Sequence, residues 1–193
     1  GQIDGDNLDK YLIMGELSLD GTVQPNKGAL PIAIQARKEG FKGFILPKQN
    51  AREAAIVNDL EVYGVESLTQ VAVFFDGNTQ NQPEIVNTRE EFFKSLTAYD
   101  SDFSEVRGQE NIKRALEIAA AGGHNAILIG PPGAGKTMLA KRLPTILPPL
   151  SLQEALETTK IHSVAGKLPE NATLISKRPF RSPHHTISDV ALV

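Results

Sequence analysis

Residues 130–137 carry the clearest chemical signal in the sequence. They read Gly-Pro-Pro-Gly-Ala-Gly-Lys-Thr and match the pattern G-x-x-x-x-G-K-[ST], in which glycines let consecutive backbone N–H groups turn toward phosphate oxygens. In such a loop Lys136 neutralises the β- and γ-phosphates of a nucleotide, and the Thr137 hydroxyl ligates Mg²⁺. The motif therefore predicts binding of ATP or ADP together with Mg²⁺.

The residues on either side of this phosphate loop predict the elements that hold it. Residues 125–129 are a short apolar run expected to form a strand, and residues 137–143 are expected to begin a helix whose positive end faces the phosphates. A random chain of this length matches the fixed positions about 1% of the time, and the strand-then-helix context makes a chance match rarer. The predicted nucleotide-binding residues of this segment are Gly130, Pro131, Pro132, Gly133, Ala134, Gly135, Lys136, Thr137 and Met138.

Composition places the chain among ordinary soluble globular proteins. Of its 193 residues 40% are hydrophobic and 22% are charged. No run approaches the roughly 18 apolar residues of a membrane span, and the first residues lack the regions of a signal peptide. The absence of cysteine from the sequence excludes disulfides, thiolate metal sites and cysteine nucleophiles. The sequence therefore predicts a cytoplasmic protein with no membrane partner.

Residues 11–76 alternate strand and helix signals, which favours an α/β layer structure. The expected strands are residues 11–14 and 22–23, which flank a tight turn at Asp20-Gly21, and residues 43–46, which end at Pro47. A helix is expected over residues 28–39, with Gly40 as its C-cap. Capping-box spacing predicts two further helix starts, at Asn50 with Glu53 and at Ser67 with Gln70.

The composition changes between residues 76 and 102, where amides and charged residues replace the apolar runs. Such residues cannot repay the entropy of ordering by apolar burial, so a linker is expected. Charge also differs between the halves, since residues 1–100 carry 9 Lys/Arg against 15 Asp/Glu and residues 101–193 carry 11 against 8. The predicted division is a first domain over residues 1–77, a linker over 78–100 and a second domain over 101–193.

Further motifs in the second half are shared with one group of ATPases. They are residues 102–110 (Asp-Phe-Ser-Glu-Val-Arg-Gly-Gln-Glu), 124–125 (His-Asn), 143–150 (Leu-Pro-Thr-Ile-Leu-Pro-Pro-Leu) and 178–186 (Arg-Pro-Phe-Arg-Ser-Pro-His-His-Thr). With the phosphate loop, they make residues 100–193 resemble the magnesium-chelatase-like AAA+ ATPases of the ComM/YifB type. The resemblance implies that Val106, Gly108 and Gln109 belong to the stretch that packs on the adenine, and that the protein assembles with itself as a hexamer.

The same resemblance implies parts that are missing from the sequence. Hydrolysis in AAA+ modules uses a second strand ending in Asp-Glu, sensor residues and an arginine from a neighbouring subunit. After Thr137 no run of four apolar residues is followed by Asp-Glu. The sequence therefore predicts a piece of a longer ATPase that stops before this strand, contains no complete set of catalytic residues and does not turn over ATP by itself.

The first half resembles the C-terminal proteolytic domain of Lon proteases. The resemblance lies in residues 15–25 (Gly-Glu-Leu-Ser-Leu-Asp-Gly-Thr-Val-Gln-Pro), 28–30 and 45–50. Those enzymes use a Ser–Lys dyad, but the stretch that corresponds to the lysine-bearing helix, residues 30–34, holds no lysine. The serine-bearing segment would lie upstream of Gly1. Because a serine hydroxyl without a base is a poor nucleophile, no peptidase activity is expected.

A basic segment near the end of the chain is a candidate substrate contact. Three cations surround one aromatic ring over five residues, a composition that can contact phosphates and stack on a base. It is equally typical of a surface loop whose arginines pair with carboxylates of a neighbouring subunit. Adjacent histidines lack the spacing of a helical metal pair, so no metal site is expected there. The candidate residues are Lys177, Arg178, Phe180, Arg181, His184 and His185.

Three functions follow from these motifs. The leading one is a DNA-processing motor ATPase of the kind involved in competence, recombination or branch migration. The second is a magnesium-chelatase subunit that remodels a partner for Mg²⁺ insertion into a porphyrin, which the Lon-like first half argues against. The third is a nucleotide-dependent scaffold without catalysis. The expected fold is α/β, with a Lon-protease-like α/β domain followed by a partial P-loop NTPase (AAA+) α/β domain.

Overall fold

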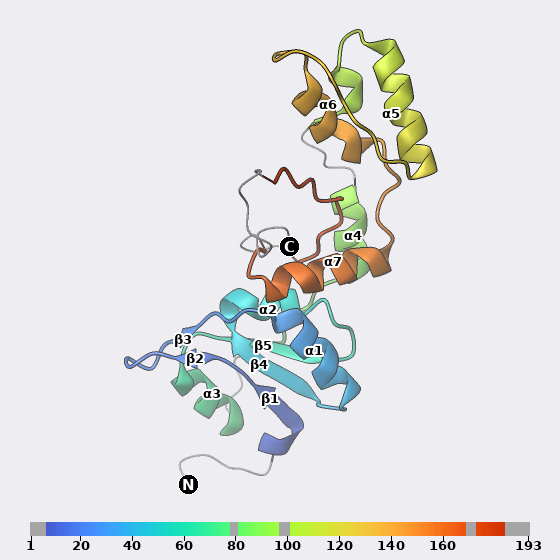
Figure 1. Cartoon of the computed structure of the whole chain (residues 1–193). Helices are drawn as coiled ribbons and strands as arrows, with labels where there is room; N and C mark the ends of the chain where they lie inside the picture. Colours follow the sequence, from blue (N-terminus) through green and yellow to red (C-terminus); the bar gives the residue numbers. More distant parts are fainter. Residues whose placement is uncertain (1–6, 78–80, 97–100, 169–172, 184–193) are drawn as a thin grey trace.

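A parallel three-stranded sheet organises the N-terminal half of the protein (Figure 1). The computed structural model describes residues 7–77, 81–96, 101–168 and 173–183. After the short 3₁₀ turn η1 (Leu8–Lys10), the sheet is formed in the order β1 (Tyr11–Ile13), β4 (Gly43–Pro47) and β5 (Glu61–Val65). Leu12 lies opposite Phe44, and Ile45 lies opposite Tyr63. The mixed α/β class expected from the sequence is confirmed.

The hairpin at Asp20-Gly21 differs in one strand from the expectation. Its strands are β2 (Glu16–Leu17) and β3 (Val23–Gln24), and the expected strand at residues 11–14 is instead β1 of the parallel sheet. The Met14 N–H donates to the Ile45 carbonyl, which keeps the chain on β4 to the end of β1. The apolar run that begins at residue 11 therefore joins the parallel sheet. The first strand of the hairpin consists only of the two residues that directly precede Ser18.

Helices cover both faces of the sheet. The α1 helix (Ala29–Lys38) and α2 helix (Lys48–Ala54) pack on one face, and α3 (Leu68–Phe75) packs on the other. Side chains alternate between the faces, with Phe44 and Val62 toward α1 and α2, and Ile45 and Tyr63 toward α3. This alternation gives the N-terminal half two apolar layers, one on each side of the sheet.

The ends of α1 and α3 agree with the capping signals. After α1, the Phe41 N–H donates to the Ala36 carbonyl and the Gly40 N–H donates to the Arg37 carbonyl, which is the Schellman pattern. Ser67 is the N-cap of α3, and its hydroxyl accepts from the Gln70 N–H at 3.4 Å. The helix ends are thus set by residues close by in the chain, as the spacing predicts.

The expected capping box at Asn50 and Glu53 is wrong. Both residues lie inside α2 and are buried, so neither is at a helix start. Glu53 Oε1 instead accepts from the Leu30 N–H at the beginning of α1, at 2.9 Å. The chain contains a true capping box elsewhere, at Ser151 and Glu154, where the hydroxyl and the carboxylate bond reciprocally to backbone N–H groups.

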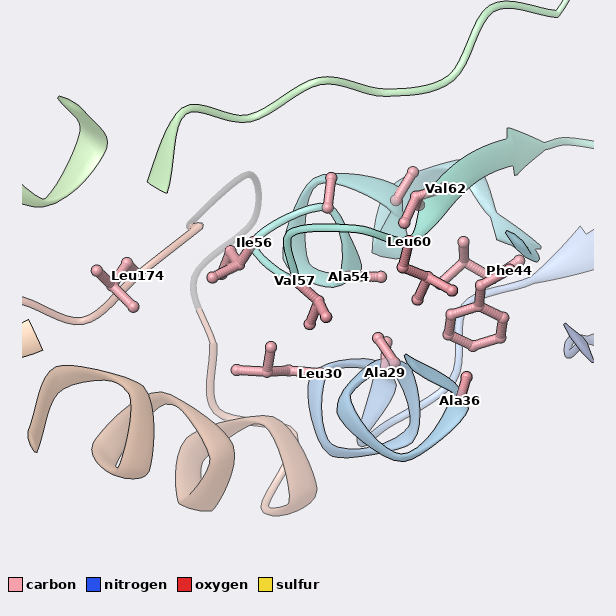
Figure 2. Close-up of a cluster of buried hydrophobic side chains, with 14 of the residues drawn as sticks. Ala29, Leu30, Ala36, Phe44, Ala54, Ile56, Val57, Leu60, Val62 and Leu174 are labelled. Atoms are coloured by element: carbon pink, nitrogen blue, oxygen red, sulfur yellow. The ribbon is translucent and has the colours of Figure 1, made fainter. Parts of the chain in front are cut away.

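Residues from beyond position 80 complete the main apolar cluster of the N-terminal half. The segment expected to be a linker contains α4 (Thr88–Leu96), in which Phe92 is buried in this cluster and the Thr88 hydroxyl donates to the Ile56 carbonyl. Farther along, α7 (Leu152–Val164) adds Ala155, and Leu174 joins the same cluster beside Leu30 and Ile56 (Figure 2). One core is therefore assembled from residues up to 145 positions apart, from Ala29 to Leu174.

The remaining elements surround a smaller cluster. They are η2 (Phe103–Glu105), α5 (Glu110–Gly122), α6 (Lys136–Arg142) and η3 (Leu143–Thr145). Phe103, Val106, Leu116 and Leu139 form their shared core. Figure 1 shows α5 and α6 side by side, with α7 between them and the sheet.

The expected strand at residues 125–129 is not formed. No residue in the described part of the chain pairs with this stretch, and Ile127 and Ile129 are 84% and 89% exposed. A strand exists only through hydrogen bonds to a neighbour, so an apolar run without one stays an extended segment.

Among the described helices, none combines the length and apolar character that crossing a membrane requires.

Candidate nucleotide-binding site

The phosphate loop ends in a short helix whose first N–H groups have no acceptor within the helix. Gly135 is the N-cap of α6 and brings no side chain that could accept from these groups. The first acceptor within the helix is the Gly135 carbonyl, which takes the Leu139 N–H at 3.0 Å. The N–H groups of Lys136, Thr137 and Met138 therefore have no acceptor inside the helix and are available to an anion.

Two glycines give the loop a backbone that other residues adopt only under strain. Gly133 has φ +80° and Gly135 has φ +78°, both in the left-handed region. A hollow of about 360 Å³ opens beside them and is lined by residues 132–138. Thr137 is exposed and belongs to this lining.

Lys136 folds back over the loop. Its Nζ donates to the carbonyl of Gly130 at 2.8 Å and to that of Pro131 at 2.7 Å. Within the described part of the chain, these neutral carbonyls are the acceptors that the ammonium group has. An anionic phosphate oxygen is a stronger acceptor than a carbonyl, so the lysine is placed to exchange one for the other.

Gln109 reaches the loop from the start of α5. Its Nε2 lies 3.5 Å from the Ala134 carbonyl, and both Gly108 and Gln109 have positive φ, +67° and +56°. Val106, which the sequence predicts beside the adenine, has a buried side chain that packs in the cluster with Leu139 below α6. The structure thus brings Gln109 to the loop, while the Val106 side chain supports the helix that follows the loop.

An ion pair that the sequence does not predict fastens the far end of α6. Arg142 donates to Glu105 Oε2 through Nε at 3.2 Å and through Nη2 at 2.7 Å. The hydrogen bond from Arg142 lowers the pKa of Glu105 below its ordinary value. The two residues lie 37 positions apart, so no local pattern could have indicated their contact.

The candidate substrate-contact residues lie beside α7. Arg178 Nε donates to the Pro148 carbonyl at 2.7 Å, and its Nη2 lies 3.9 Å from Glu154. Arg181 Nη2 lies 3.3 Å from His162 Nε2, and Phe180 is 41% exposed. His184 and His185 lie outside the described residues. No group of three or more potential metal ligands occurs in the part of the chain that the structure describes.

Comparison with known proteins places this arrangement in a family. A model described as magnesium chelatase, subunit ChlI, matches residues 102–193, and a model described as subunit ChlI of Mg-chelatase matches residues 1–50. The chain is 41% identical to protein YifB of Escherichia coli over 197 residues, covering 100% of this chain and 37% of that protein. Competence protein ComM of Haemophilus influenzae is 38% identical over 193 residues, with coverages of 100% and 37%. The chain belongs to the magnesium-chelatase-like family of the ComM and YifB type.

Membership in this family confirms the resemblance seen in the sequence. The Lon-like character of the chain also has support, because an archaeal Lon protease of Halobacterium salinarum is 30% identical over 110 residues, 57% of this chain and 16% of that protein. The chain spans little more than a third of the length of YifB and ComM. The activities of those whole proteins are therefore assigned to this member of the magnesium-chelatase-like family only as a proposal.

Proposed function

We propose that this chain is the nucleotide-binding part of an AAA+ ATPase that processes DNA in competence or recombination. The observation that carries nucleotide binding is the phosphate loop, in which Lys136 lines the hollow and the first N–H groups of α6 lack helical acceptors. Backbone N–H groups and one lysine cation directed at one point are what a polyphosphate needs. The magnesium-chelatase-like family supports this assignment.

In this proposal each residue of the loop has one task. Lys136 binds the β- and γ-phosphates, the N–H groups of the loop orient them, and the exposed Thr137 hydroxyl holds Mg²⁺. When bound, Mg²⁺ neutralises phosphate charge and fixes the geometry of the phosphate chain. Gln109 limits the movement of the loop through the Ala134 carbonyl.

The DNA part of the proposal rests on the relatives and on charge. One relative is named a competence protein, and the cations Lys177, Arg178 and Arg181 flank the half-exposed Phe180 along the sequence. Cations bind phosphates and an exposed ring stacks on a base, which suits single-stranded DNA. We further propose that the whole protein is cytoplasmic and works as a homohexamer.

Titration calorimetry of the purified chain with Mg²⁺-ADP tests nucleotide binding. We expect Lys136→Ala to lower the affinity about tenfold or more, because a charge-assisted contact is lost. Lys141→Ala is the matched control, since this exposed lysine lies on the same helix and outside the loop, and its affinity is expected to stay within about twofold. Equal affinities of the wild type and Lys136→Ala would reject the site.

A second measurement on the full-length protein separates the candidate activities. ATP hydrolysis stimulated by DNA supports the DNA motor, and stimulation only by a porphyrin and its partner would assign the protein to chelatase work. Absence of ATP turnover under both conditions, with nucleotide binding intact, would identify the protein as a nucleotide-dependent scaffold without catalysis.

A further inference from the structure

Helix α7 is fastened by a buried polar junction to the N-terminal layer, by which we mean the parallel sheet with α1, α2 and α3. Ser163, which is 2% exposed, donates its hydroxyl proton to Glu53 Oε1 in a short hydrogen bond. The Ser163 carbonyl accepts from the Gly28 N–H at 3.2 Å. The two side chains come from positions 110 residues apart, so this junction joins the second half of the chain to the first.

Glu53 serves α1 and α7 with the same oxygen. Besides the Ser163 hydroxyl, Oε1 accepts from the Leu30 N–H at 2.9 Å, in the first turn of α1. The N-cap of α1 is Gly28, which has no side chain to accept from that turn, so Glu53 takes this task. A carboxylate near a helix N-terminus is also favoured by the helix dipole.

Asn50 holds the carboxylate in position from within α2. Its Nδ2 lies 3.5 Å from Glu53 Oε2, and the same amide exchanges two hydrogen bonds of 2.9 Å with the backbone of Asn26. Every buried side-chain polar atom in the described part of the chain has a partner. Removing the Ser163 hydroxyl would therefore take one hydrogen-bond donor from a buried carboxylate whose remaining donors, the Leu30 N–H and the Asn50 amide, stay in place.

The face of α7 that meets the layer carries small side chains, which make one direct side-chain hydrogen bond to it. Ala155, Thr159 and Ser163 are spaced four residues apart and are all buried. The Thr159 hydroxyl donates to the Ala155 carbonyl and accepts from the Ile175 N–H, so both of its partners belong to the second half of the chain. Of these three side chains, only Ser163 bonds to the N-terminal layer.

The connection from the phosphate loop to this junction is short. Helix α6 continues into η3, which ends at Thr145, and α7 begins at Leu152. Within the connector, Leu150 is buried in the main core and the Pro148 carbonyl accepts from Arg178. A shift of α6 is therefore either absorbed over six residues or transmitted to α7.

We propose that the hydrogen bond between Glu53 and Ser163 is a latch that fixes α7 to the start of α1. Closed, it holds both helices in one arrangement. Open, it frees α7 and the first turn of α1, while the sheet stays folded through Phe44, Ile45 and Val62. The latch rests on the packing of this chain and does not require that a nucleotide be bound.

Hydrogen exchange of the nucleotide-free chain, followed by mass spectrometry, tests the latch. In Ser163→Ala we expect exchange in residues 152–164 and 29–32 to become about tenfold faster, with β4 and β5 unchanged, because a local opening exposes only the elements that it frees. Thr158→Ala is the matched control, since this hydroxyl on α7 has no hydrogen bond to a described residue, and its exchange is expected to match the wild type.

A milder variant decides the question if Ser163→Ala does not fold. Glu53→Gln keeps an acceptor for the Leu30 N–H, and we expect the same two segments to exchange faster, by a smaller factor. Faster exchange of β4 and β5 to the same degree as α7 would overturn the latch, because it would make Ser163 part of one cooperative core. Unchanged exchange of α7 in both variants would overturn it as well.

Discussion

His162 shows how neighbours set the protonation of a single side chain. It lies partly buried on α7, and burial lowers its pKa below the ordinary value of 6.5, with the charge of Arg181 lowering it further and a backbone hydrogen bond with Lys167 opposing part of this shift. The folded protein thus binds this proton less readily than the unfolded chain. The contribution of His162 to stability is therefore complete above pH about 6.5 and is lost as the pH falls toward the pKa of the folded state.

We expect Arg181→Ala to raise the pKa of His162 without restoring 6.5, because burial is the larger cause and remains. An NMR titration of the imidazole protons measures this directly. Arg178→Ala is the control, because this guanidinium contacts Pro148 and Glu154, and the variant should leave the pKa of His162 unchanged. The same midpoint in Arg181→Ala and wild type would contradict the contact with Arg181.

At the residue scale, sequence reasoning succeeds where the pattern is continuous along the chain. The helix that begins directly after Gly135 could be predicted because residues 130–137 form one continuous motif, and nucleotide binding by this motif stays a prediction. Glu53 and Asn50 were misinterpreted because spacing gives the distance between two side chains but not their partners. Glu53 accepts from Leu30 and Ser163, 23 and 110 residues away, and no local pattern contains that information.

At the element scale, the same distinction separates helices from strands. The C-terminal end of α1 and the N-cap of α3 were predicted because a helix makes its hydrogen bonds within itself and its ends are set by nearby residues. The run at residues 125–129 has an equally apolar sequence, but a strand depends on a neighbour that lies elsewhere in the chain. Its exposed Ile127 and Ile129 show that apolar composition alone does not make a strand.

The basic segment beside α7 gives a prediction at this scale. In the full-length protein, Arg178→Ala and Arg181→Ala should each reduce the slope of log affinity against log salt for single-stranded DNA by about one unit, because one phosphate contact is lost. Phe180→Ala should weaken binding by about 1–3 kcal/mol and leave the slope in place, since stacking is not screened by salt. Fluorescence anisotropy at several salt concentrations measures both quantities.

Arg37→Ala is the matched control for these arginine variants, because its partner Asp59 lies on the N-terminal layer and it should not change the salt slope. Unchanged DNA affinity in Arg178→Ala and Arg181→Ala, accompanied by loss of oligomer, would refute the DNA contact and assign the segment to a subunit interface.

At the scale of the whole molecule, Phe92 links the middle of the chain to the N-terminal core. We expect Phe92→Ala to lower the free energy of unfolding by about 3–5 kcal/mol, as for other large buried aromatic residues. Phe93→Ala is the control, because this neighbouring ring is 60% exposed and should cost at most about 1.5 kcal/mol, the value of its ring contact with Phe92.

Urea unfolding followed by circular dichroism compares the two variants of this aromatic pair. Were residues 78–100 only a linker, both substitutions would leave the unfolding of the N-terminal half at its wild-type midpoint. A large loss confined to Phe92→Ala is the result that the burial of its ring in the main cluster requires.

The position of Leu174 in the main core has a consequence for the order of events during synthesis. A ribosome releases the sheet, α1 and α2 first, yet their core lacks Phe92, Leu150, Ala155 and Leu174 until the later residues have emerged. Contacts of such long sequence separation form slowly, because a long stretch of chain must be closed before any of them is made. Until those residues emerge, the α1 and α2 side of the nascent sheet therefore has an incomplete core.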